Sequence, residues 1–148
     1  MNTTAPLSPS ERFIALYEQL QPGPVTRAQL ESVYAPHIVF SDPLHSVRGL
    51  DQLTQYFDGL YRNISDIEFE FHRTLNKDSE TIAHWTMHFR HPRILRGKKR
   101  ISVEGTSILR WQDDLIIAHQ DIFDAGALLY EHLPVLGWVI RKLKERMQ

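Results

Sequence analysis

The sequence predicts a single α+β domain in which a curved, largely antiparallel β-sheet wraps around helices. Two helical segments come first, a third follows one brief strand, and four consecutive strand-like segments come next. Those four segments alternate apolar and polar residues, which indicates strands with one covered face. The early helices supply that cover, and 148 residues suffice for one such core.

The helices are predicted from apolar spacing between capping and breaking residues. Residues 11–20, "ERFIALYEQL", repeat apolar side chains at helical spacing behind Ser8 or Ser10 as N-cap, and "QPGP" ends the helix. A second short helix is expected over residues 27–34, with Thr26 as its N-cap, and Ala35–Pro36 ends it. The third, over residues 49–64, is expected to carry an apolar stripe of Leu50, Leu53, Tyr56 or Phe57, and Leu60.

The strands are predicted from their alternation and from the turn residues between them. The first is "HIVFSDP", and the others cover residues 66–76, 81–91, 100–111 and 115–124. In residues 81–91, one face is expected to carry Ala83, Trp85, Met87 and Phe89.

Two segments lie outside this alternation. Residues 1–9 are expected to form a disordered arm, and the domain is expected to cover residues 10–148. Its last part, about 126–148, is predicted to be a helical cap that breaks near Pro134.

Composition limits the classes of function. The net charge is −1 with the histidines neutral, so no global attraction to nucleic acid or to an acidic membrane is expected. The chain has no cysteine, which excludes disulfides, thiol nucleophiles and cysteine-bound zinc. No secretory signal or membrane-spanning run is recognised. We therefore expect a cytoplasmic protein without nucleic-acid or membrane partners.

Two strings of residues carry a family resemblance. In "YAPHIVFSDP" and the "RGLDQLTQYF" that follows, a helix end leads to a strand closing in Asp-Pro and then to a Gly-led helix. The second string, "LIIAHQDIFDAGAL", is a last strand with an aromatic–Asp ending. From about Ser10 to about Leu129, the chain resembles the nuclear transport factor 2-like superfamily, in particular its SnoaL-like and ketosteroid isomerase-like branches. That superfamily includes isomerases, dehydratases, epoxide hydrolases, cyclases and non-enzymatic binders, so the fold does not set the function.

The resemblance implies a cone in which helices and the concave sheet face enclose an apolar cavity. A small apolar ligand is the expected partner, with no cofactor, and a homodimer through the convex sheet face is also expected. The side chains expected around the cavity are Phe13, Tyr17, Phe40, Phe57, Trp85, Met87, Ser107, Leu109 and Phe123.

Asp42 is the first candidate catalytic residue. In ketosteroid isomerases, the Asp of the matching Asp-Pro step removes a proton next to a carbonyl. A carboxylate at the edge of an apolar cavity is partly desolvated, which strengthens it as a base. The alternative is that Asp42 only starts the turn before Pro43. The sequence leaves both interpretations open.

The donors that stabilise the enolate oxygen in those isomerases are largely missing from this chain. Their first-helix tyrosine aligns with Phe13, although Tyr17 lies one turn later on the same face and could replace it. Their protonated aspartate aligns near Ser107. Because such donors contribute orders of magnitude to the rate, steroid isomerisation by that mechanism is not expected.

His119 and Asp121 form the second candidate site, because strand residues i and i+2 share a face. Ile117 is expected on that face, and Ile116 on the other. Asp121 also matches one catalytic carboxylate of limonene-1,2-epoxide hydrolase. That enzyme's catalytic triad also requires an Arg-x-Asp pair on a neighbouring strand, and the neighbouring strand here lacks one. His119 and Asp121 are either an acid–base pair or a hydrogen-bonded structural pair.

Two other patterns have simpler explanations. His72, His84 and His88 are expected on the outer face near Glu104 rather than at a metal, because no metal-binding motif accompanies them. The basic run over residues 90–100 is predicted to be a solvated hairpin tip.

Two functions are compatible with these observations. One is the binding of a small hydrophobic molecule in the cavity, with isomerase- or dehydratase-type proton transfer. Asp42 would then be the base, and His119 and Asp121 would assist. The alternative is a non-catalytic dimeric binding or interaction module whose own side chains fill the cavity. Whether the protein is an enzyme stays open on the sequence.

Overall fold

The computed structural model describes residues 6–92, 99–125 and 145–146. Most of the predicted cap at about 126–148, and part of the predicted arm at 1–9, lie outside these ranges, and both stay predictions. The elements confirm the predicted α+β class. They are α1 (Pro9–Gln19), α2 (Arg27–Leu30), β1 (Tyr34–Ser41), β2 (Ser46–Arg48), α3 (Leu50–Arg62), β3 (Asp66–Lys77), β4 (Glu80–Arg90), β5 (Ile101–Gln112) and β6 (Leu115–Phe123).

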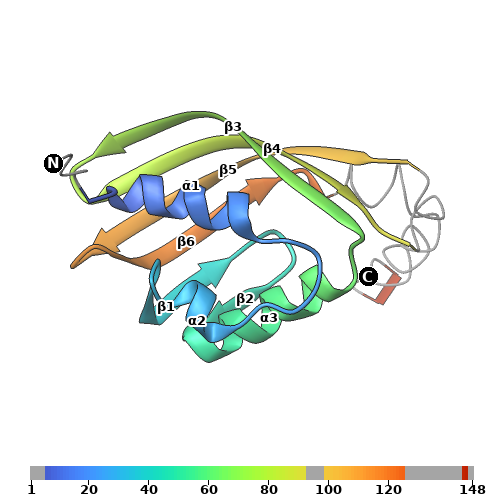
Figure 1. Cartoon of the computed structure of the whole chain (residues 1–148), viewed down its shortest axis with the longest axis horizontal. Helices are drawn as coiled ribbons and strands as arrows, with labels where there is room; N and C mark the ends of the chain where they lie inside the picture. The colour runs from blue at the N-terminus through green and yellow to red at the C-terminus, as the bar shows by residue number, and fades with distance from the viewer. Residues whose placement is uncertain (1–5, 93–98, 126–144, 147–148) are drawn as a thin grey trace, which may run out of the picture.

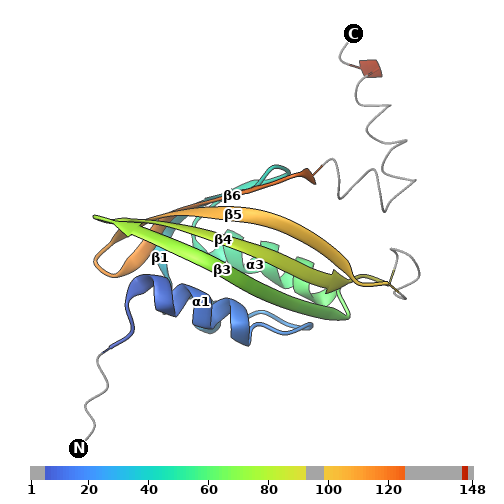
Figure 2. The same cartoon turned by 90° about the horizontal axis from the view of Figure 1, so that it is seen from above.

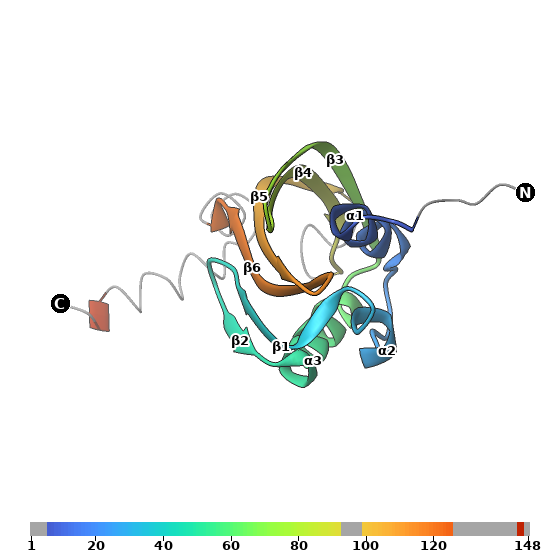
Figure 3. The ribbon, with the colours of Figure 1, turned by 90° about the vertical axis from the view of Figure 1, so that its left-hand side faces the viewer.

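The strands form one mixed sheet in the order β2-β1-β6-β5-β4-β3 (Figure 1). Strands β3 to β6 are consecutive antiparallel neighbours, whereas β1 lies parallel to β6. Helices α1 and α3 lie on the same side of the sheet (Figure 2). Viewed from one end, the sheet curls from β3 round to β2 and leaves the two helices on its open side (Figure 3). This curl creates the concave face that holds the core.

The two long helices form where the residues predict them. Ser8 caps α1, because its Oγ accepts the N–H of Glu11 at 3.3 Å. Helix α3 buries one face, and Leu60, which was predicted to lie on that face, is instead 47% exposed. Tyr61 takes the inner position, since the residues buried on α3 are Leu50, Leu53, Phe57 and Tyr61.

The chain between α2 and α3 differs from the prediction. Helix α2 ends at Leu30, and β1 begins at Tyr34, so that Pro36 lies inside a strand. A proline is tolerated there because the register of β1 with β6 shifts between Tyr34 and Val39, where no N–H is needed from position 36. Strand β2 was not predicted, since its three residues are too few to show an alternating pattern.

A β-bulge changes the faces of β6. The β5–β6 register shifts at Trp111, which pairs with Ile116. Ile116 is therefore in the core at 0% exposure, and the prediction that it faces outward is wrong. His119 and Asp121 lie beyond the bulge and share a face, as predicted.

Candidate functional site

An apolar cavity of about 320 Å³ lies between α3, α1 and the concave face of the sheet. Its volume is at the lower end of the range for ligand pockets, about 300–1,000 Å³. The wall is formed by Tyr17, Phe40, Asp42, Leu44, Tyr56, Phe57, Gly59, Leu60, Tyr61, Asn63, Ile64, Ile67, Phe69, Trp85, Met87, Phe89, His91, Asp121 and Phe123.

The wall includes both candidate carboxylates, Asp42 and Asp121. It also includes most of the apolar residues expected around the cavity, namely Tyr17, Phe40, Phe57, Trp85, Met87 and Phe123. His119 and three other expected residues are buried behind the wall instead, and these three are Phe13, Ser107 and Leu109.

The Trp85 indole separates strand β5 from the cavity. A Cβ atom on Gly105 would lie only 2.4 Å from Cη2 of Trp85, so the ring rests against the β5 backbone at this glycine. Its Nε1 donates a hydrogen bond to Oγ of Ser107 at 2.9 Å. Trp85 therefore covers β5 at Gly105 and Ser107 and keeps Ser107 out of the wall. Phe13 lies outside the wall too, packed against Tyr17 with the ring centroids 4.7 Å apart.

Asp121 is held by a network of buried donors. Its Oδ1 accepts a hydrogen bond from Oγ of Ser107 at 2.5 Å and lies 2.6 Å from Nε2 of His119. Because the indole N–H of Trp85 can only donate, Ser107 accepts from it and directs its own hydrogen to Asp121. With Asp121 as a carboxylate, Nε2 of His119 carries a hydrogen and donates it. Oδ2 accepts no hydrogen bond from the described residues, and the side chain keeps 16% exposure in the cavity wall.

The network continues from the other imidazole nitrogen to two tyrosines. Nδ1 of His119 lies 2.9 Å from the hydroxyl of Tyr34, which lies 2.9 Å from the hydroxyl of Tyr17. In a neutral imidazole, Nδ1 accepts when Nε2 carries the hydrogen, so Tyr34 donates to His119 and Tyr17 donates to Tyr34. Burial raises the pKa of both tyrosines well above the usual value, and each keeps its proton at neutral pH. The Tyr17 hydrogen is thus committed to the protein.

Asp42 both starts a turn and lines the cavity, so the two interpretations of the sequence are compatible. Its Oδ1 accepts the backbone N–H groups of Leu44 and His45, each at 2.8 Å. Its Oδ2 accepts a hydrogen bond from the Tyr56 hydroxyl. Both oxygens of Asp42 therefore have donors, whereas Oδ2 of Asp121 has none among the described residues.

Tyr61 is a wall residue that sequence reasoning missed. It lies on α3 one turn after Phe57 and is 5% exposed. Burial, and then the negative charge of Asp121, raise the pKa of Tyr61. The available signal was the spacing of Leu50, Leu53, Phe57 and Tyr61, which places the tyrosine on the inner face of the helix.

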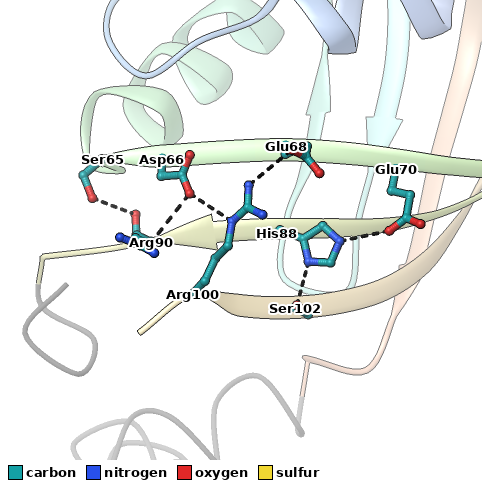
Figure 4. Close-up of polar contacts among 8 residues, drawn as sticks. All are labelled: Ser65, Asp66, Glu68, Glu70, His88, Arg90, Arg100 and Ser102. Carbon is teal, nitrogen blue, oxygen red and sulfur yellow. Dashed lines mark hydrogen bonds and ion pairs between the residues drawn. The ribbon is translucent and has the colours of Figure 1, made fainter. Parts of the chain in front are cut away.

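The histidines of β3 and β4 lie on the outer face and have protein partners, as predicted. Nε2 of His84 lies 2.6 Å from Glu104. His88 contacts both Glu70 and Ser102 (Figure 4), and its hydrogen bond lowers the pKa of Glu70. Within the described residues, no three His, Asp or Glu side chains are grouped so that they could hold a metal ion.

The first and last residues of the basic run, Arg90 and Arg100, form ion pairs with β3. Asp66 lies 3.9 Å from Nε of Arg90 and 2.9 Å from Nε of Arg100, and Arg100 also reaches Glu68 at 3.6 Å (Figure 4). Residues 93–98 of the predicted hairpin tip at 90–100 lie outside the described residues, and the tip stays a prediction. In the part of the chain that the structure describes, no helix has the length and apolar character needed to cross a membrane.

The curled mixed sheet, the helices on its concave side and the apolar cavity define a cone of the nuclear transport factor 2-like class. The model of the SnoaL-like domain matches residues 11–119, and the chain therefore belongs to the SnoaL-like domain family. No curated protein matches the chain.

Solved structures from several organisms share this fold. A protein from Jannaschia sp. CCS1, described as a SnoaL-like polyketide cyclase, superposes with a TM-score of 0.70 at 14% identity, over 87% of this chain and 95% of its own. TsrD from Streptomyces laurentii gives 0.65 at 20% identity, over 82% and 90%. An LEH-like epoxide hydrolase from M. tuberculosis gives 0.66 at 12% identity, over 90% and 93%. At these identities the likeness shows the fold alone.

Proposed function

We propose that the protein binds a small apolar carbonyl compound in the cavity and moves a proton on it, with Asp121 as the base. The observation that supports this most directly is the position of the Asp121 carboxylate. One oxygen is held by Ser107 and His119, and the other lies in an apolar wall without a donor among the described residues. A base held in this way is oriented before the ligand arrives.

In this reaction, Oδ2 of Asp121 takes a proton from the carbon next to the ligand carbonyl. The C–H bond breaks, an O–H bond forms on Asp121, and the electron pair moves onto the carbonyl oxygen. In a β,γ-unsaturated ketone, Asp121 returns the proton to the γ-carbon while the C=O bond re-forms and the C=C bond moves into conjugation, which completes an isomerisation. In a β-hydroxy ketone, the C=O bond re-forms, a C=C bond forms and the C–O bond to the β-hydroxyl breaks; that oxygen takes the proton from Asp121 and leaves as water, which completes a dehydration. His119 and Ser107 are positioning residues, because they act on the carboxylate and not on the ligand.

The base assignment differs from the sequence-based expectation, which gave this role to Asp42. A ligand that used Asp42 would have to displace Tyr56 from Oδ2 or compete with the two backbone N–H groups on Oδ1. Asp121 needs no such displacement. We therefore assign proton transfer to Asp121 and leave Asp42 with the turn at the cavity wall.

The test uses 2-tetralone, a compact aromatic ketone with acidic C–H groups beside its carbonyl. In D₂O, wild-type protein is expected to exchange these hydrogens for deuterium faster than buffer alone, as followed by NMR. Asp121→Asn is expected to lower the protein-dependent rate at least about 100-fold, in the range for loss of general acid–base catalysis. Loss of exchange in Asp42→Asn, with exchange kept in Asp121→Asn, would overturn the base assignment. No exchange and no binding by wild type would overturn the function.

A homodimer through the convex sheet face is part of the proposal. Leu75, Ile82 and Ile108 are direct cross-strand neighbours on the face away from the helices and are 64%, 43% and 36% exposed. A contiguous apolar row on an outer face is typical of an interaction surface. Ile82→Glu is expected to convert a wild-type dimer to a monomer in light scattering after size exclusion. A wild-type protein that is monomeric at about 100 μM, far above the Kd of a stable dimer, would refute the homodimer.

The alternative function, a module whose own side chains fill the cavity, is less well supported, because about 320 Å³ is open between α1, α3 and the sheet. The cytoplasmic location expected from the sequence stays a prediction.

A further inference from the structure

Three tyrosines belong to the cavity wall, and their hydroxyls differ in what they bind. Tyr17 donates to Tyr34, and Tyr56 donates to Asp42. The hydroxyl of Tyr61 forms no hydrogen bond with the described residues, although Tyr61 is only 5% exposed. Tyr61 lines the cavity, and its hydroxyl oxygen is not one of the fully buried side-chain atoms that lack a partner. A ligand in that cavity can therefore accept the hydrogen of this hydroxyl.

We infer that Tyr61 donates a hydrogen bond to the carbonyl oxygen of the ligand while Asp121 removes the neighbouring proton. The inference rests on the proposed function and adds the donor that the sequence lacks in α1, where Phe13 has no hydroxyl. It also explains why Tyr17 does not fill that role, since its hydrogen is directed to Tyr34.

The surroundings of Tyr61 fit a donor rather than a base. Burial and the charge of Asp121 keep its proton in place, and the same charge acts on Tyr17 and Tyr34. Tyr61 and Asp121 both line the same cavity of about 320 Å³, so one small ligand can contact both. As the C–H proton moves to Asp121, negative charge leaves that carboxylate and develops on the carbonyl oxygen. A phenol held there strengthens its hydrogen bond as the charge develops, and this lowers the barrier.

The wall also restricts the chemical class of the carbonyl compound. It holds two carboxylates, Asp42 and Asp121, one imidazole, His91, and no Lys or Arg among its described residues. A ligand carboxylate would face repulsion from both carboxylates, with no permanent cation in the described wall to offset it. The geometry therefore favours an uncharged ketone or aldehyde over a keto acid.

The experiment compares 2-tetralone with tetralin, a hydrocarbon of nearly the same shape that lacks the carbonyl. Binding is measured by quenching of tryptophan fluorescence, since Trp85 lies in the wall. Tyr61→Phe is expected to weaken 2-tetralone binding about five- to tenfold, the range for loss of one hydrogen bond, and to leave tetralin binding within about twofold. Thr54→Val is the matched control, because it removes from the same helix a hydroxyl that donates to the Leu50 carbonyl and lies outside the wall. Its ratio of ketone to hydrocarbon affinity is expected to equal that of wild type.

A second measurement does not depend on a variant. The ¹³C resonance of 2-tetralone labelled at the carbonyl is expected to move downfield on binding to wild type, as it does when the oxygen accepts a hydrogen bond. An unmoved resonance, or equal losses of ketone and hydrocarbon affinity in Tyr61→Phe, would overturn the inference while leaving the proposed function intact. If neither compound binds wild-type protein, the proposed function fails, and the inference fails with it.

Discussion

Substitution of Gly105 by alanine tests the packing that holds the site. The added Cβ would lie 2.4, 2.7 and 2.8 Å from three atoms of the Trp85 ring. Because Gly105 lies in a regular strand and does not need a positive φ, the effect of the methyl group is steric. The indole must move away from β5, and its hydrogen bond to Ser107 at 2.9 Å weakens.

The expected cost follows from these contacts. Forcing a methyl group into a packed core costs about 1–3 kcal/mol, and loss of one buried hydrogen bond costs about 1 kcal/mol. Reduced flexibility of the unfolded chain offsets about 0.4–1 kcal/mol. Gly105→Ala should therefore lower the free energy of unfolding by about 2 kcal/mol, which corresponds to a Tm lower by about 4–8 °C in a chain of this size.

Urea denaturation with an unchanged m-value measures this difference. Gly59→Ala is the control, because no atom lies within 4 Å of its added Cβ and it lies inside α3. That control is expected to stabilise the protein by up to about 1 kcal/mol.

A double-mutant cycle with Trp85→Phe tests this packing, since the smaller ring makes room for the methyl group. Gly105→Ala should cost less in the Trp85→Phe background than in wild type, with a coupling energy of at least about 0.5 kcal/mol. Equal costs in the two backgrounds, or a Gly105→Ala protein as stable as wild type, would show that the indole does not rest on this glycine.

Three other predictions concern the buried polar groups and a surface pair. Tyr34→Phe removes the donor to His119 and should lower the free energy of unfolding, measured by urea denaturation, by about 1–3 kcal/mol. Tyr61→Phe should change that free energy little. A larger loss in Tyr61→Phe than in Tyr34→Phe would contradict the hydrogen-bond assignments. The free energy of unfolding should fall as pH rises above about 10, because the tyrosines whose pKa is raised by folding stay protonated in the folded state and ionise in the unfolded state. Tyr61→Phe should make that fall shallower by up to about 1.4 kcal/mol per pH unit. An unchanged slope would argue against the raised pKa of Tyr61. The hydrogen bond from Arg62 lowers the pKa of Asp58, so this carboxylate stabilises the protein above its ordinary pKa of about 3.9 and loses that effect as pH falls through the lowered value. Asp58→Asn should therefore lower Tm at pH 7 and not at pH 2. The same Tm difference between variant and wild type at both pH values would refute the linkage.

Much of the fold was predictable because the patterns that set it are local. Alternation along β4 identified Ala83, Trp85, Met87 and Phe89 as the inner face, and the face of α1 followed from helical spacing. The bulge at Trp111 was not predictable, because it depends on pairing with a second strand. Strand β2 was missed for a similar reason, since its three residues are strand only because they pair with β1.

The site was predictable in its residues and less so in its connections. Asp42, His119 and Asp121 were identified from their positions in two strings of sequence. The hydrogen bond between Tyr34 and His119 joins residues 85 positions apart, and no local pattern reports it. The same is true of the Trp85–Ser107–Asp121 contacts, which occupy one carboxylate oxygen of Asp121, whereas the other has no donor in the part of the chain that the structure describes.

The parallel pairing of β1 with β6 has a consequence for biosynthesis. During translation, β1 leaves the ribosome long before β6, and this parallel pair cannot form until the last strand has emerged. Until then β5 is an unpaired edge, and the partly made sheet can associate with other chains. A nascent chain arrested before residue 115 would therefore lack both the complete sheet and the His119–Asp121 pair. We expect such arrested chains to depend on chaperones far more than chains released at full length.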